Sequence, residues 1–175
     1  MRKQALLFCC AQVVLLCYAQ IHKNRILVFL CLWLFLLYIA YTCIHNYELP
    51  VLLFYLPWTA LLRFSPDSIS FYTLALLMVG CIEIVKNKFQ LKNYYVSIAL
   101  VIAVLSLLAK IISGYRLTNS YLMFLAMLVL FPMLDFENRG YDFYWLTVSF
   151  AIGIIIAALT AERFAGYPHI AQYIK

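Results

Sequence analysis

The sequence has few charged residues. Of its 175 residues, 11% are Asp, Glu, Lys or Arg and 67% are hydrophobic, and the mean hydropathy is +0.95. Soluble domains are about half apolar and about a quarter charged, whereas disordered proteins combine low hydrophobicity with high charge. The composition therefore excludes a disordered chain, argues against a soluble enzyme, and predicts a membrane protein.

The sequence also lacks the spacings that identify metal sites and disulfide frameworks. No two cysteines form a Cys-x-x-Cys pair, and no histidine stands at metal-ligand spacing from them. All six lie within or at the ends of apolar runs, where a buried thiol behaves as a small hydrophobic side chain. They are Cys9, Cys10, Cys17, Cys31, Cys43 and Cys81. We predict no disulfide framework, no metal ion and no other cofactor.

Motifs for nucleotide binding and hydrolysis are absent as well. There is no Gly-x-x-x-x-Gly-Lys-Ser/Thr, no Gly-x-Ser-x-Gly and no His-Glu-x-x-His. Of the three histidines, His22 and His45 lie in short polar turns and His169 lies near the end of the sequence. The Lys and Arg residues fall almost entirely between apolar runs, which favours lipid headgroups over nucleic acid as their partners.

Two charged residues fall inside apolar runs. Glu83 precedes Lys86 by three residues near the end of its run, so we expect an ion pair or a position at the membrane surface. Lys110 lies two residues before its run ends and can also reach the membrane surface. The alternative for Lys110 is a cation that faces an internal cavity, since charge within a membrane is costly and often functional.

Long apolar runs separated by polar turns predict membrane helices, because about 20 apolar residues in a helix cross a bilayer. The third run is short and contains Pro57, so we expect a tilted short helix or a re-entrant segment there. We expect Ser68 to cap the helix of the fourth run. The predicted fold class is all-α: a polytopic membrane protein with six to seven transmembrane helices in a single domain, residues 1–175. The runs cover residues 5–21, 26–44, 50–62, 69–85, 94–112, 121–134 and 143–161.

Three arginines occupy alternate turns between these runs. If the runs cross the membrane in alternating directions, Arg63, Arg116 and Arg163 lie on one side. Guanidinium groups bind phosphate oxygens bidentately, so these residues are candidates to bind a pyrophosphate or an anionic sugar. Contact with lipid headgroups is the alternative, and the spacing alone favours it.

Small residues recur every four positions along the last run. Ser149, Gly153, Ala157 and Ala161 would therefore lie on one face of a helix. Such a face allows a second helix to approach closely, and van der Waals contact drives helix association in lipid. We predict that this face packs against another helix.

Several short segments resemble one bacterial membrane protein family. The segments are Leu56-Pro57-Trp58, residues 63–73, Tyr141-Asp142-Phe143-Tyr144, Phe150-Ala151-Ile152-Gly153, Ala157-Ala158-Leu159 and residues 167–174. In the order and the residue types of these segments, residues 50–175 resemble the amino-terminal half of bacterial O-antigen ligase and O-antigen polymerase-like proteins.

The resemblance implies an integral glycosyltransferase at the outer side of the cytoplasmic membrane. The donor in that family is a glycan on a polyprenyl pyrophosphate, and no metal or nucleotide takes part. The family's catalytic arginines and histidine lie in its second half, and none of them corresponds to a residue of this sequence. We therefore expect a truncated or split protein that handles the lipid-linked oligosaccharide in surface polysaccharide assembly and is inactive alone.

The composition makes the lipid bilayer a partner, and the resemblance implies two more: the polyprenyl-pyrophosphate-linked glycan and a separate carboxy-terminal half. A non-enzymatic multi-pass membrane subunit or a small transporter is the alternative. We expect the cluster Lys86, Lys88 and Lys92 to be cytoplasmic, because it is the densest group of lysines beside apolar runs. Seven crossings then give a cytoplasmic amino terminus and six give an outer one; we favour seven.

Overall fold

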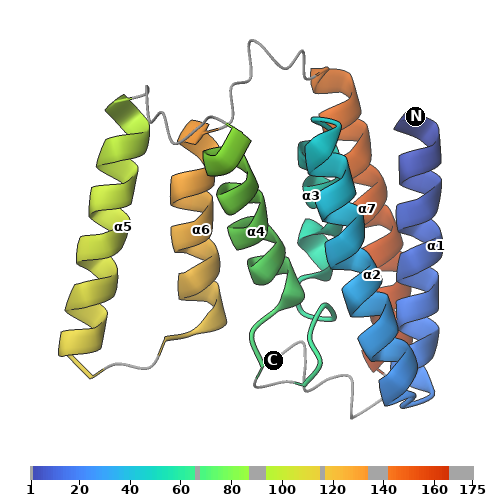
Figure 1. Ribbon diagram of the computed structural model, residues 1–175. Helices are drawn as coiled ribbons and strands as arrows, with labels where there is room; N and C mark the ends of the chain where they lie inside the picture. Colours follow the sequence, from blue (N-terminus) through green and yellow to red (C-terminus); the bar gives the residue numbers. More distant parts are fainter. Residues whose placement is uncertain (1, 66–67, 87–93, 115–116, 134–141, 166–175) are drawn as a thin grey trace. The chain divides into compact units, whose positions relative to one another are not determined.

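The computed structural model describes the chain except residues 1, 66–67, 87–93, 115–116, 134–141 and 166–175 (Figure 1). Side chains of residues 2–3, 131–133 and 161–165 are likewise outside the description. Within the described residues there are helices and turns but no strand. The predicted all-α fold class is confirmed.

Each predicted apolar run coincides with a helix. The third run is the one that departs from a single helix, since a short α-helix there continues into one 3-10 turn. The elements are α1 (Arg2–Ile21), α2 (Arg25–Ile44), α3 (Glu48–Tyr55), η1 (Leu56–Trp58), α4 (Phe71–Lys86), α5 (Tyr94–Ile112), α6 (Asn119–Met133) and α7 (Phe143–Ala165).

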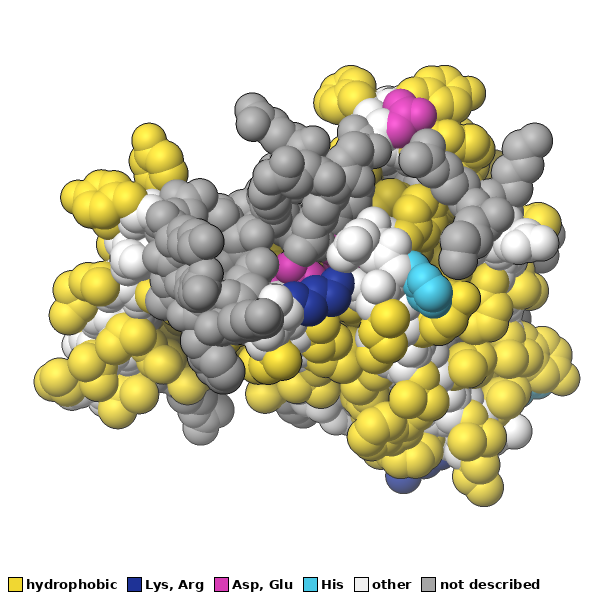
Figure 2. All heavy atoms as spheres, turned by 45° about the horizontal axis from the view of Figure 1, so that its top comes forward, with side chains coloured by type: hydrophobic (Ala, Val, Ile, Leu, Met, Phe, Trp, Pro, Cys, Tyr) yellow, Lys and Arg dark blue, Asp and Glu magenta, His cyan; other side chains and the backbone are white. Residues whose placement is uncertain are grey.

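Four of the described helices are long and apolar enough to cross a membrane: α1, α2, α5 and α7. The apolar stretches Glu48–Trp58 and Asn119–Leu130 are shorter. Large hydrophobic side chains on the long helices are exposed, among them Leu7, Ile26, Ile112 and Leu159. Figure 2 shows one face of the molecule, on which most coloured side chains are hydrophobic and few are charged. Exposed apolar surface of this kind is typical of a protein embedded in lipid.

The chain divides into two compact units, each described here by itself. Unit 1 comprises residues 1–72 and 141–175, with α1, α2, α3, η1 and α7. Unit 2 comprises residues 73–140, with most of α4 and all of α5 and α6. The prediction that residues 1–175 form a single domain stays a prediction.

A tight turn joins α1 to α2. Lys23 adopts a left-handed backbone conformation with φ of 53°, and the N–H of Asn24 donates to the carbonyl of Ala19 at 2.9 Å, which closes the end of α1. The Asn24 side chain then accepts from the N–H of Leu27 at 3.1 Å and caps α2. The two helices consequently run antiparallel (Figure 1).

Helix α3 lies inside unit 1, where α1, α2 and α7 contact it. Nearly all of its side chains are buried, as expected for a helix that is apolar on every face. Pro50 falls in the first turn, where its missing N–H costs no helical hydrogen bond, whereas Pro57 lies within the 3-10 turn η1, just beyond the end of α3. The missing N–H and the ring of Pro57 explain why the third run is not one continuous helix.

Helix α4 is capped by a different serine from the one predicted. Ser70, not Ser68, precedes its first residue, and the Ser70 hydroxyl accepts from the N–H of Tyr72 at 3.2 Å. The Ser68 hydroxyl instead closes a local turn with Ser65, accepting from its N–H at 3.1 Å and donating to its carbonyl at 2.7 Å.

Helix α7 packs against α3, and Gly153 lies at this contact. Ser149 and Gly153 are buried and Ala157 is half-buried; the side chain of Ala161 lies outside the described part. A Cβ placed on Gly153 would lie 3.1 Å from the carbonyl carbon of Phe54 and closer still to its oxygen. The backbones of the two helices therefore approach to a distance that only glycine allows at this position.

Candidate functional site

The candidate site is the irregular segment that follows the interrupted third helix, residues 59–70. The first part of this segment is covered by protein, since Leu61 and Leu62 are almost completely buried, whereas Phe64 and Ile69 are exposed. Non-helical backbone within a membrane is tolerated only when protein or a water-filled cavity surrounds it. Leu61 and Leu62, at the start of the segment, meet this condition, and the chain beyond them leads to the end of unit 1.

Three groups near the start of α4 satisfy the carbonyls left by the break. The Ser70 hydroxyl lies 2.9 Å from the carbonyl oxygen of Thr59 and 3.2 Å from that of Leu62. The N–H of Phe71 donates to Leu62 at 2.7 Å. The Tyr72 hydroxyl reaches back into α3 and donates to the carbonyl of Leu52 at 3.1 Å. These bonds fix the chain on both sides of Arg63.

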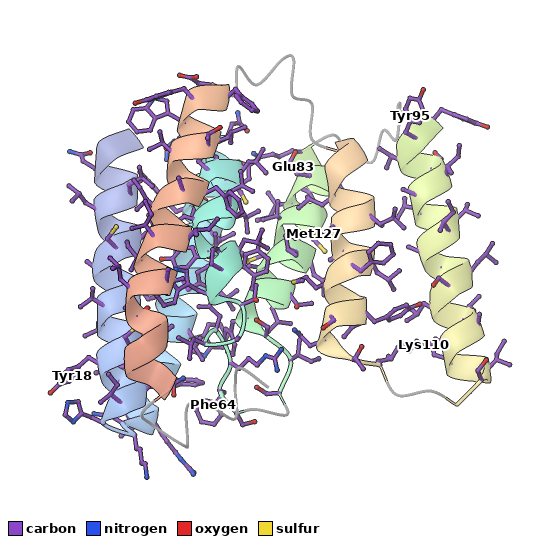
Figure 3. All side chains as sticks on the ribbon, turned by 180° about the vertical axis from the view of Figure 1, so that it is seen from behind. Tyr18, Phe64, Glu83, Tyr95, Lys110 and Met127 are labelled. Atoms are coloured by element: carbon purple, nitrogen blue, oxygen red, sulfur yellow. The ribbon has the colours of Figure 1, made fainter. Side chains whose placement is uncertain are left out.

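Arg63 is the predicted binding residue that the structure describes best. Its side chain is half-buried, and its Nε atom is inaccessible to solvent. The amide of Gln20, at the end of α1, lies 3.5 Å from the Arg63 carbonyl oxygen and holds the backbone there. Phe64, the next residue, lies at the end of unit 1 where α1 ends and α2 begins (Figure 3).

The other two predicted arginines are described less fully. Arg163 lies in the last turn of α7, and that helix ends at the same end of unit 1 as the segment with Arg63 (Figure 1). The side chain of Arg163 and all of Arg116 lie outside the description. The structure therefore brings two of the three sequence positions to one end of unit 1 and leaves the prediction for the third untested.

A buried polar cluster in unit 1 was not predicted from the sequence. The Tyr55 hydroxyl donates to the Gln12 side-chain oxygen at 2.6 Å, and the Gln12 amide donates to the Cys31 carbonyl at 2.9 Å. The cluster thus joins α1, α2 and α3. Gln12 and Gln20 are the two amides of an otherwise apolar run, and that contrast was the available signal.

Among the described residues, two carboxylates are completely buried, Glu48 and Glu83. Glu83 lies 3.4 Å from the ammonium group of Lys86 one turn later, which is the pairing expected from their spacing. Glu48 is the first residue of α3, where the helix dipole favours a negative charge. Sequence analysis did not single out Glu48, since it follows a polar turn and reads as a surface residue.

The histidines form no catalytic or metal-binding cluster within the described residues. His22 and His45 are exposed, and their rings lie against Tyr18 and Tyr41 at centroid distances of 4.3 Å and 4.5 Å. His169 lies outside the description. In the part of the chain that the structure describes, no three His, Cys, Asp or Glu side chains are placed to hold a metal ion.

No family model, curated protein or solved structure matches this chain. The likeness to O-antigen ligase and polymerase-like proteins therefore rests on the short segments of the sequence alone.

Proposed function

We propose that this chain is the amino-terminal membrane half of a glycan ligase or polymerase-like protein of the cytoplasmic membrane. In this proposal it binds a polyprenyl-pyrophosphate-linked oligosaccharide during surface polysaccharide assembly and does not transfer the glycan by itself. A separate carboxy-terminal half supplies the residues for transfer.

The observation that supports donor binding best is the position of Arg63. Its backbone is held by Gln20 on one side and follows the bonded carbonyl of Leu62 on the other. A guanidinium on a backbone that is held in place loses little conformational entropy when it forms two parallel hydrogen bonds to phosphate oxygens. The sequence position of Arg163, in the last turn of α7, lies at the same end of unit 1.

We propose that the chain does not transfer the glycan alone because of the groups that this reaction needs. A base must activate the acceptor hydroxyl, and cations must stabilise the leaving pyrophosphate. Asp67 and Glu162 are the nearest carboxylates in sequence to Arg63 and Arg163. A neighbouring cation favours the charged form of a carboxylate and makes it a weaker base.

The path of the third segment supports seven membrane crossings. Helix α3 begins at the end of unit 1 where α2 ends, and residues 59–65 lie at the opposite end, where α2 begins (Figure 1). The third segment therefore passes from one end of unit 1 to the other. With seven crossings and cytoplasmic Lys86, Lys88 and Lys92, the amino terminus is cytoplasmic and Arg63 is on the outer side.

A small transporter is the second candidate function, and the interrupted third helix favours it. Transporters often place substrate at discontinuous helices in the middle of the membrane. A non-enzymatic membrane subunit would need neither Arg63 nor the interruption. The three candidates differ in what they bind, and a binding measurement separates them.

The test is binding of a short-chain polyprenyl pyrophosphate to the purified full chain in detergent, measured by native mass spectrometry. We expect Arg63→Gln to weaken binding by about tenfold or more, since hydrogen bonds to charged groups contribute about 1.5–3 kcal/mol. Arg63→Lys should recover only part of the loss, because an ammonium does not bind bidentately.

The matched control is Arg25→Gln. Arg25 is exposed at the start of α2, at the same end of unit 1, so this variant removes one charge without removing the candidate ligand. If Arg63→Gln binds the probe as well as Arg25→Gln does, with equal thermal stability, the donor-binding proposal is wrong.

A further inference from the structure

Unit 2 contains a cavity of about 290 Å³ between α4, α5 and α6. Its lining is apolar and includes Leu76, Gly80, Ala103, Leu107, Leu125 and Ala126. At Gly80 a Cβ would meet no atom within 4 Å, so the open space reaches the backbone of α4. The cavity is therefore wide enough at this point to accept a larger side chain without a clash.

An open apolar cavity of this size suits an apolar occupant. Protein interiors are close-packed, and atoms that line a void lose their dispersion contacts. Water does not fill an apolar cavity, because it finds no hydrogen-bond partners there. Helix α5, which forms one wall, exposes many large hydrophobic side chains, including Val104, which also lines the cavity. In a bilayer, the hydrocarbon chain of a lipid can therefore reach the cavity.

A cation lies one helical turn beyond the cavity. Lys110 follows the lining residue Leu107 on α5, and its ammonium group lies 4.1 Å from the ring centroid of Tyr121. The Tyr121 hydroxyl is hydrogen-bonded to Ser106 at 2.6 Å, which holds the ring in place. Figure 3 shows Lys110 near the end of α5 that leads to α6.

This cation is suited to the headgroup of a lipid. Among the residues that the structure describes, Glu83 pairs with Lys86, near the opposite end of unit 2, and not with Lys110. A lysine two residues from a helix end can place its ammonium at the level of lipid headgroups. A hydrocarbon chain in the cavity would bring its phosphate to this level.

We propose that unit 2 binds an anionic membrane phospholipid, with one acyl chain in the cavity and the phosphate group at Lys110. The proposal goes beyond donor binding at Arg63 and is independent of it, because the two sites share no residue. It makes the cavity a lipid site and keeps Lys110 at the membrane surface, the first of the two roles that the sequence left open for it.

The chain-binding part is tested with Gly80→Leu. Full-length protein is purified from vesicles of phosphatidylglycerol and phosphatidylcholine, and retained lipid is counted by native mass spectrometry. The leucine side chain fills the space beside α4, so we expect retained phosphatidylglycerol to fall about tenfold. The fold should not suffer, because leucine clashes with nothing described at its Cβ and has a higher helix propensity than glycine.

The control is Ala109→Leu, which adds a similar side chain to an exposed position of α5. Equal lipid retention in Gly80→Leu and Ala109→Leu would overturn the cavity as the binding site. A change of oligomeric state in Gly80→Leu, without loss of lipid, would also overturn it and would identify the cavity as a contact between copies.

The headgroup part is tested with Lys110→Gln. We expect the preference for phosphatidylglycerol over phosphatidylcholine to fall about fivefold, in line with about 1 kcal/mol for a lysine near an anionic lipid surface. Total acyl-chain binding should persist, because the cavity is unchanged. An unaltered preference for phosphatidylglycerol would overturn the role of Lys110.

Discussion

At the scale of single residues, the structure shows how a mostly apolar sequence uses its few polar side chains. Gln12, Gln20 and Ser70 are buried, and each bonds to backbone or side-chain groups of another segment. Backbone groups freed by a break in a helix are costly in lipid unless such partners exist. Of these side chains, Gln20 and Ser70 bond to carbonyls of the irregular segment after α3.

Tyr55→Phe tests the buried cluster. The variant removes the hydroxyl that donates to Gln12 and leaves the amide oxygen of Gln12 without that donor. We expect a loss of about 1–2 kcal/mol in the free energy of unfolding in mixed detergent micelles. Tyr41→Phe is the control, since Tyr41 is exposed on α2. An equal effect of both substitutions would show that the cluster contributes nothing specific.

The residue scale is also where sequence analysis was least accurate. Ser68 and Ser70 are equally good caps in the local pattern, and contact with the carbonyls of Thr59 and Leu62 decides for Ser70. The local sequence pattern cannot predict a contact between residues this far apart in the chain. Arg63 was found because its charge interrupts apolar sequence, whereas the hydrogen bond that holds its carbonyl comes from Gln20, far away in the chain.

At the scale of helices, the pattern of the sequence was sufficient for most boundaries. Predicted and observed ends of the fifth run agree at Tyr94 and Ile112, because polar turns flank a long apolar run. The third run differs, since α3 ends at Tyr55, before Pro57. Its length made the run ambiguous, and the structure identifies the proline as the point where regular helix stops.

Gly153→Leu tests the contact between α7 and α3. Any side chain at this position meets the backbone of Phe54, so the helices must move apart. We expect a loss of about 1–3 kcal/mol in the free energy of unfolding. The matched control is Ile154→Leu on the exposed face of the same helix. If both variants resist detergent unfolding equally, the small residues do not form the packing face that we predict.

At the scale of the whole molecule, composition was enough to predict a helical membrane protein but not how its helices pack against one another. Helices that are apolar all round give no signal for which face meets which neighbour. The contact of α3 with α7 joins segments almost a hundred positions apart, and the pattern of neither run identifies the other. The division into two units is likewise a property of tertiary contacts alone.

The two proposed sites lie in different units and have different chemistry. Unit 1 offers Arg63 beside an irregular, buried segment, which suits the pyrophosphate of a lipid-linked glycan. Unit 2 offers an apolar cavity with Lys110 one turn beyond it, which suits a phospholipid. The two proposals together describe a membrane half that binds its donor in unit 1 and a phospholipid in unit 2.

One measurement tests this account most directly. The purified chain in lipid nanodiscs is incubated with a radiolabelled oligosaccharide on polyprenyl pyrophosphate and with an acceptor glycan, and the label is followed. The account predicts that the nanodiscs retain labelled donor, that Arg63→Gln nanodiscs lose it, and that no label reaches the acceptor. Label on the acceptor, or equal retention by wild type and Arg63→Gln, would contradict it.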